Sequence, residues 1–257
     1  MNIYDYKDNI LQLTMELEQL RHTIPIPKEI TDSDLKEAYT KARALDQYLQ
    51  YYFNDKSRPI ASKDKINEGI DKIFEGCYKL LIGSLENVKA KFLKEKDLPD
   101  SDRVNLFELA GTEHLFLSNQ YTRVITENLG HRFEEIASLS HLAFNHETEL
   151  NWNIRGIDVI IFDGTNIRYT QLKTKRDTLT GSQVPRSNQE LSIHQNSIFA
   201  AALDIGNGWT FNNRKDNLYP VTRLAGESFW KLIDIDYSYV LGKSKELMKK
   251  LEDYLYT

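Results

Sequence analysis

The chain has 257 residues, of which 40% are hydrophobic and 28% charged, and its formal net charge is −5. These fractions exclude wholesale disorder and a collagen-like or low-complexity chain, and the acidic balance argues against a general coat for nucleic acid. The single cysteine, Cys77, excludes a disulfide scaffold and a thiolate zinc site and suits a reducing cytosol. Because the sequence has no apolar run of ~20 residues and no secretory signal, we expect a cytoplasmic protein that does not enter a membrane.

Helical periodicity dominates the first hundred residues. Apolar residues at helical spacing predict helices over 8–22, 35–53 and 63–96. The Thr-Asp-Ser-Asp sequence at 31–34 is typical of a helix N-cap, and the Leu-Pro-Asp-Ser-Asp sequence at 98–102 is typical of a helix breaker. We therefore expect a helical region over 1–100, which serves dimer contacts, DNA contacts or both, and a core over 101–257.

After this boundary the sequence changes from helical to mixed. Residues 103–144 still predict helix, and the stretch 128–136 is typical of a helix that opens there. Alternating or β-branched runs then predict strands over 150–154, 157–162, 167–173, 208–211 and 219–224. A polar, basic loop is predicted over 174–188, and further helices are predicted over 189–203, 227–233 and 244–254. This order indicates a mixed α/β core that carries a helical N-terminal region.

The most informative stretch is the predicted hairpin over 157–173. Its turn, Asp-Gly-Thr-Asn at 163–166, is a strong hairpin signal, and a central loop of two or four residues gives the same pairing. In that register Asp158 lies opposite Gln171, with about 5 Å between their Cβ atoms, and Lys173 points to the same face. Three polar side chains are therefore expected to converge at one end of two otherwise apolar strands.

Two alternatives stay open at this point. A loop at 163–164 would move Asp158 opposite Tyr169 and loosen the cluster. The three polar side chains could also form an edge-strand trio with a surface salt bridge that contributes about 0–1 kcal/mol. Burying a carboxylate and an ammonium beside apolar strands is costly, however, unless a ligand or a reaction uses them.

The Gly-Ile-Asp sequence at 156–158 and the Gln-Leu-Lys sequence at 171–173 resemble the PD-(D/E)xK signature of restriction endonucleases and related metal-dependent nucleases. In that family a preceding helix often supplies a glutamate four residues after a glycine. Gly130 and Glu134 match this spacing, and Glu135 is the reserve. The chain is most similar to the ApaLI-like branch of type II enzymes.

The resemblance implies a PD-(D/E)xK nuclease core, in which helices flank a mixed central sheet, over about residues 128–235. It implies that Asp158 and Gln171 hold Mg²⁺, and that Lys173 orients or activates the attacking water. Glu134 would either support these ligands or bind a second metal ion. Gln171 departs from the acidic residue of the family pattern, and an amide brings no charge where hard cations favour carboxylates. This departure leaves open a nuclease with weakened metal affinity or one that has lost cleavage.

A local positive strip begins just before the hairpin, at Arg155, and continues beyond it. Between residues 155 and 186, six basic residues stand against three acidic ones in a chain of net charge −5. Alone, such a strip is typical of a solvated loop, but beside a metal site it suits phosphate contacts. The DNA-binding residues that we expect are Arg155, Lys175, Arg176 and Arg186 at phosphates and Thr178, Thr180, Ser182 and Gln183 at base edges.

The six histidines show no HExxH or other metal-ligand spacing. We expect them mostly at the surface or in packing. His131, three residues before Glu134, could approach a phosphate.

These features together predict a type II restriction endonuclease of bacterial or archaeal cytoplasm. We expect Mg²⁺-dependent hydrolysis of double-stranded DNA at a short, specific and palindromic site. A palindromic target calls for two symmetric active sites and hence a homodimer, with a cognate DNA methyltransferase as a functional rather than physical partner. The alternatives are a modification-dependent or less specific DNA nuclease and a non-catalytic DNA-binding protein with a decayed site.

Overall fold

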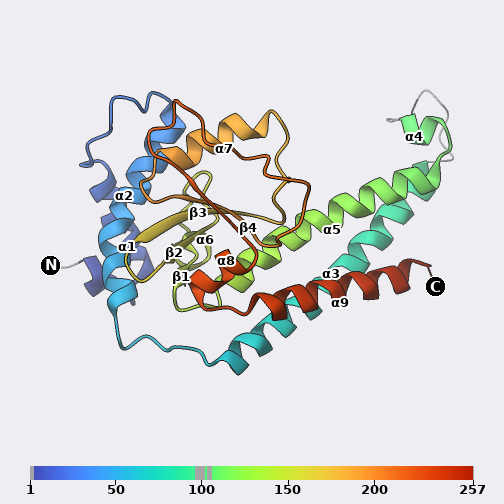
Figure 1. Ribbon diagram of the computed structural model, residues 1–257, viewed down its shortest axis with the longest axis horizontal. Helices are drawn as coiled ribbons and strands as arrows, with labels where there is room; N and C mark the ends of the chain where they lie inside the picture. The colour runs from blue at the N-terminus through green and yellow to red at the C-terminus, as the bar shows by residue number, and fades with distance from the viewer. Residues whose placement is uncertain (1–2, 96–101, 103–105, 257) are drawn as a thin grey trace.

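A five-stranded mixed sheet lies between two groups of helices in the computed structural model, which describes residues 3–95, 102 and 106–256 (Figure 1). The strands follow one another across the sheet in chain order. They are β1 (Ala143–Phe144), β2 (Val159–Phe162), β3 (Ile167–Lys173), β4 (Ile198–Ala201) and β5 (Thr222–Ala225). The first three pair antiparallel and the last three parallel, so the predicted mixed α/β class is confirmed.

Alternation along the strands gives the sheet two apolar faces. Val159 and Ile161 lie in one core, whereas Ile160 and Tyr169 lie in the other. The first core is closed by α3 (Lys63–Glu95), α5 (Glu113–Ala137), α8 (Glu227–Trp230), the short 3-10 helix Lys231–Ile233 and α9 (Tyr237–Tyr256). The second is closed by α1 (Ile10–Arg21), α2 (Ser33–Asn54), α6 (His146–Leu150) and α7 (Gln183–Ser192). The N-terminal helices thus cover both faces of the sheet.

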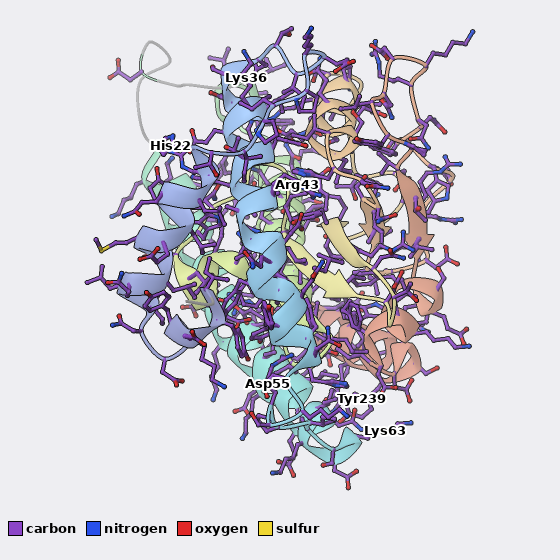
Figure 2. All side chains as sticks on the ribbon, turned by 90° about the vertical axis from the view of Figure 1, so that its left-hand side faces the viewer. His22, Lys36, Arg43, Asp55, Lys63 and Tyr239 are labelled. Atoms are coloured by element: carbon purple, nitrogen blue, oxygen red, sulfur yellow. The ribbon has the colours of Figure 1, made fainter. Side chains whose placement is uncertain are left out.

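The helices of the N-terminal region form much as their sequence predicts. The N-cap residue of α2 is Asp32, whose carboxylate accepts hydrogen bonds from the N–H groups of Asp34 and Leu35 at 2.9 and 3.0 Å. Figure 2 shows α2 passing in front of the sheet from Lys36 to Asp55, with Arg43 on its sheet side. The predicted helices over 8–22, 35–53 and 63–96 are confirmed as far as residue 95, and residue 96 lies outside the described residues. The predicted breaker at 98–102 lies outside the described residues, apart from Asp102.

Helices α3 and α5 run side by side and extend beyond the sheet, with the short helix α4 (Leu106–Leu109) at their far end (Figure 1). A 3-10 turn, Ile3–Tyr6, precedes α1. The expectation that a helix opens at 128–136 is wrong, because this stretch is the second half of α5. No helix of the described ranges combines the length and apolar character needed to cross a membrane.

Several predicted strand and loop boundaries are wrong. Residues 150–154 form no strand. Leu150 ends α6, and Trp152 and Ile154 are buried in the irregular segment that follows it, so burial of alternate residues gave the pattern of a strand. Residues 208–211 also form no strand, although Phe211 is buried and stacks on Phe199 with 4.4 Å between ring centroids.

The region around α7 differs from the prediction in a way that affects the candidate site. The loop predicted over 174–188 ends early, because α7 begins at Gln183. The helix predicted over 189–203 is instead the end of α7, a turn and β4. The short strand β1 was missed within the helix predicted over 103–144, and the last strand is Thr222–Ala225 rather than 219–224.

Candidate functional site

The β2–β3 hairpin has the register that the sequence predicts. Val159 pairs with Thr170 and Phe162 with Ile167, which excludes the shifted turn that would set Asp158 opposite Tyr169. Asp158 stands one residue before β2, and its N–H donates to the carbonyl of Thr170 at 2.9 Å. The hairpin therefore brings the start of β2 to the end of β3.

The Asp158 carboxylate is held against the end of β3. Its Oδ2 atom accepts a hydrogen bond from the backbone N–H of Leu172 at 2.7 Å and lies 3.3 Å from the Nζ atom of Lys173. The two side chains are 21% and 26% exposed, so the ion pair is mostly shielded but open to solvent. Oδ1 makes no hydrogen bond to any described residue and is left available to a ligand.

Gln171 presents an unsatisfied acceptor beside this pair. Its side chain is buried, and its Nε2 donates to the carbonyl of Gly156 at 3.2 Å. Its Oε1 atom is buried and lacks a hydrogen-bond partner within the described part of the chain. An unpaired buried acceptor is costly, which makes this oxygen a natural ligand for a cation.

Glu134 belongs to the same electrostatic environment, although it lies on α5. Burial, together with the carboxylate of Asp158, raises the pKa of Glu134 to about 8, and Lys173 offsets part of this shift. The Nδ1 atom of His131 lies 3.7 Å from Oε2 of Glu134. Glu135, the reserve, instead pairs with Arg132 at 2.6 Å.

The donor set fits a hard divalent cation in chemistry. Asp158, Gln171 and Glu134 offer two carboxylates and one amide oxygen, and Mg²⁺ prefers oxygen ligands. Among the described residues, no cluster of three or more His, Cys, Asp or Glu side chains is placed to hold a metal ion. A cation at this position therefore depends on the amide oxygen of Gln171 and on water molecules.

The basic residues of the predicted DNA-binding strip are all engaged in ion pairs. Lys175 lies 3.0 Å from Asp177, and Arg176 lies 3.2 Å from Asp204. Arg155 and Arg186 both contact the carboxylate of Glu190, at 3.0 and 2.8 Å, and Arg155 also pairs with Asp34. The local positive excess is thus largely neutralised within the chain, so phosphate contacts at these residues require ion pairs to exchange partners.

The polar residues expected at base edges lie in the loop that leads into α7 and at its first residue, Gln183. The Thr178 hydroxyl donates to the Lys175 carbonyl at 2.8 Å, and Gln183 accepts from the Thr180 N–H at 2.9 Å. The hydroxyls of Thr180 and Ser182 are 3.3 Å apart. Thr180, Ser182 and Gln183 are exposed, and Thr178 is half-buried.

Sequence reasoning missed two buried polar residues that support the site. Glu190 on α7 is 3% exposed and pairs with two arginines of the strip, Arg155 and Arg186. A Cβ added to Gly156 would lie 2.5 Å from the Cβ of Glu190, and Gly156 has φ +78°. The other is His146, the first residue of α6, which is fully buried. The glycine two residues before Asp158 was the one signal in the sequence that could have indicated such close packing.

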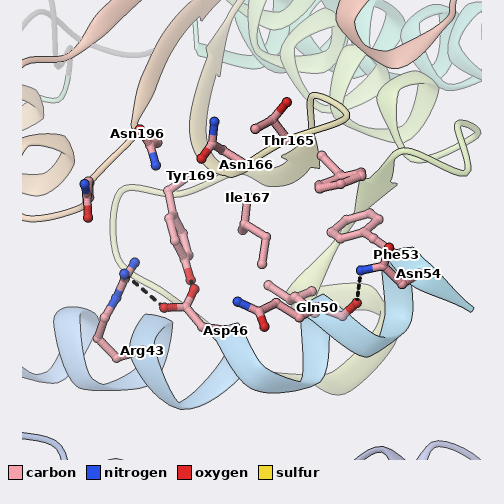
Figure 3. A pocket seen from close by; sticks show the side chains of 13 residues that line it. Arg43, Asp46, Gln50, Phe53, Asn54, Thr165, Asn166, Ile167, Tyr169 and Asn196 are labelled. Atoms are coloured by element: carbon pink, nitrogen blue, oxygen red, sulfur yellow. Dashed lines mark hydrogen bonds and ion pairs between the residues drawn. The ribbon is translucent and has the colours of Figure 1, made fainter.

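A separate cavity of about 430 Å³ lies at the turn end of the hairpin, between α2 and β3 (Figure 3). Arg43 and Asp46 form an ion pair there at 2.9 Å, and the Tyr169 hydroxyl donates to Asp46. The ion pair neutralises itself, and the lining includes no second carboxylate. This cavity is therefore a poorer place for a divalent cation than the opposite end of the hairpin.

No protein-family model matches the chain, and no curated protein sequence matches it.

Proposed function

We propose that this protein is a Mg²⁺-dependent deoxyribonuclease that hydrolyses phosphodiester bonds of double-stranded DNA. More specifically, we propose a type II restriction endonuclease with a PD-(D/E)xK core, which cuts DNA at a short specific site. The observation that carries the proposal is the unpartnered Oε1 atom of Gln171 beside the carboxylate of Asp158, with Lys173 at the same position. An acid, an amide oxygen and an ammonium in this arrangement suit the chemistry of a phosphate ester.

The role that we propose for each residue of the site follows from its charge. Oδ1 of Asp158, Oε1 of Gln171 and the carboxylate of Glu134 would hold the ion, which offsets the negative charge that builds up on the phosphate when bound. Lys173 would orient the attacking water and contact a phosphate oxygen, because its ammonium group is only partly shielded. Because its pKa is about 8, the Glu134 carboxyl group is protonated at neutral pH, and it would lose this proton when a cation binds.

The partners follow from the same proposal. Two symmetric cuts at a palindrome require two copies of the site, so we expect a homodimer with twofold symmetry on double-stranded DNA. A cognate DNA methyltransferase would protect the host sequence without binding this chain.

A digest of one plasmid tests the proposal. The purified protein is incubated with supercoiled DNA in Mg²⁺, in Ca²⁺ and in EDTA. We expect discrete linear fragments in Mg²⁺ and intact DNA in EDTA. A smear in Mg²⁺ would indicate a less specific nuclease, and digestion only of methylated plasmid would indicate a modification-dependent one. Intact DNA under all conditions, with methylated and unmethylated genomic DNA as well as the plasmid, would overturn the nuclease proposal.

A non-catalytic DNA-binding protein with a decayed site is the second candidate. It is favoured by the amide at Gln171, which removes one negative charge from the donor set. Gel-shift assays in EDTA and digestion in Mg²⁺ together separate the two, because a decayed protein binds DNA in the first and leaves it intact in the second.

A further inference from the structure

We propose that His146 is the positioning residue of this site, and that its ring fixes the peptide group on which Asp158 is carried. The inference rests on the proposed function, because Asp158 is the cation ligand there. His146 is fully buried, and neither its spacing to other histidines nor its place in α6 gives it a metal-binding role. Its contacts lie instead with the backbone that leads into β2.

The His146 ring lies between two backbone carbonyl groups. Its Nδ1 atom is 2.5 Å from the carbonyl oxygen of Trp152, and its Nε2 atom is 3.0 Å from that of Ile157. The backbone carbonyl of His146 also accepts a hydrogen bond from the Trp152 N–H at 3.0 Å. Carbonyl oxygens only accept, and a neutral imidazole has one N–H, so the ring can donate to one of these two carbonyls. With that N–H on Nε2 the ring donates to Ile157, and the backbone bond from Trp152 holds the other end of the irregular segment 152–157, which has no strand or helix to fix it.

The contact with Ile157 acts directly on the site. The carbonyl of Ile157 and the N–H of Asp158 belong to one planar peptide group. His146 contacts this group on its oxygen, and the Thr170 carbonyl accepts from its N–H at 2.9 Å. With both ends held, the Asp158 side chain leaves the backbone in the direction that reaches the Leu172 N–H.

The same segment also positions the second oxygen ligand. The Gly156 carbonyl accepts from Nε2 of Gln171 at 3.2 Å, which directs Oε1 of Gln171 away from Gly156. Gly156 is next to the residue that His146 holds. A shift of this backbone would therefore move Asp158 and release Gln171 together, and groups that orient metal ligands commonly change metal affinity when they are lost.

Two variants separate the contacts of the His146 ring. His146→Gln keeps an amide donor near the position of Nε2, which contacts Ile157, whereas His146→Asn keeps one near Nδ1, which contacts Trp152. His194 provides the matched control, because it is also fully buried and its ring nitrogens have no partner within the described ranges. Its ring stacks on Tyr169 at 4.8 Å, a contact that His194→Phe preserves.

The measurements are the Mg²⁺ concentration that gives half-maximal cleavage, Ca²⁺ affinity by calorimetry, and the melting temperature in EDTA. For His146→Asn we expect half-maximal cleavage at about tenfold higher Mg²⁺ and a matching loss of Ca²⁺ affinity. For His146→Gln we expect both values within about threefold of the wild type, and for His194→Phe no change in either.

The results separate failure of this inference from failure of the proposed function. If the wild type neither binds Ca²⁺ nor cuts DNA in Mg²⁺, the proposed function fails. If the wild type does both, equal shifts for the Asn and Gln variants overturn the positioning role. Unchanged Ca²⁺ affinity with a lowered melting temperature, or failure of His146→Asn to fold, shows that the ring serves the fold as a whole and also overturns it.

Discussion

Oδ2 of Asp158 lies 3.3 Å from Nζ of Lys173 and 2.7 Å from the backbone nitrogen of Leu172, so one oxygen of this carboxylate is held by β3. The other oxygen, Oδ1, makes no hydrogen bond to a described residue. The arrangement splits the carboxylate into an anchored atom and a free atom. A cation ligand needs both properties, because the anchor fixes the geometry and the free atom binds.

Asp158→Asn is expected to reduce Mg²⁺-dependent cleavage by about 100-fold or more, because it removes the charge of the main ligand and keeps its shape. Plasmid cleavage rates measure the loss, and gel shifts in Ca²⁺ should still show specific binding. Asp216→Asn is the control, since Asp216 is exposed and pairs with Arg214. A normal cleavage rate for Asp158→Asn would remove this residue from the site.

Gln171→Glu is expected to lower the Mg²⁺ concentration needed for half-maximal cleavage and to lower the melting temperature in EDTA. The new carboxylate would face Asp158 without a cation and gain a ligand charge with one. Added Mg²⁺ should therefore restore the melting temperature, as expected for a ligand that binds the folded state. Gln195→Glu, at an exposed position, should change neither value. The same melting curve with and without Mg²⁺ would contradict the assignment of Gln171 to the cation.

The meeting of Asp158, Gln171 and Lys173 could be predicted because it depends on local rules. Side chains alternate along a strand, and a strong turn fixes which residues of a hairpin face each other. Those rules need only residues 157–173. The place of Glu134 could not be obtained in this way, because it depends on how α5 packs against the sheet, and its prediction came from a resemblance.

The supporting contacts could not be predicted, because their partners are distant in sequence. Arg155 pairs with Asp34 from α2 and with Glu190 from α7, so its positive charge does not remain free as the local count suggested. The same limit explains the false strand at 150–154. Burial on one side of an irregular segment gives the alternation of a strand, and only the packed structure shows that the His146 ring lies against two of its carbonyl groups.

Glu134 predicts how stability depends on pH in the absence of metal. Its pKa is about 8 in the folded protein and about 4.5 unfolded, so the folded state binds more protons between these values. Its contribution to stability is therefore greatest below about pH 4.5, declines as pH rises, and is lost above about pH 8. Glu134→Gln should remove this decline, because the amide cannot ionise.

Urea denaturation in EDTA at about pH 5.5 and about pH 8.5 measures the effect. One pKa unit corresponds to about 1.4 kcal/mol, so we expect the wild type to lose at least about 1 kcal/mol more than Glu134→Gln over this range. Glu135→Gln is the matched control, because Glu135 is the next residue of α5 and pairs with Arg132. It should keep the pH profile of the wild type. Parallel profiles for all three proteins would show that Glu134 is not buried beside Asp158.

Gly156→Ala is expected to destabilise the protein by more than about 2 kcal/mol, because alanine is strained in this backbone conformation and its Cβ would overlap the side chain of Glu190. The φ angle is +78°, and the added atom would lie 2.5 Å from the Cβ of Glu190. Gly164→Ala separates the two causes, because Gly164 has φ +90° and an added Cβ there meets no atom within 4 Å. Gly164→Ala should therefore cost about 1 kcal/mol, from backbone strain alone.

Gly156→Ala is also expected to disturb the candidate site, because the Gly156 carbonyl accepts a hydrogen bond from the side chain of Gln171. Urea denaturation gives the two stabilities, and cleavage at saturating Mg²⁺ gives the two activities. We expect Gly156→Ala to lose activity as well as stability and Gly164→Ala to keep normal cleavage, because its turn lies at the far end of the hairpin. Equal losses of stability in the two variants would mean that α7 does not pack against Gly156, and that Glu190 is free to move away from Arg155.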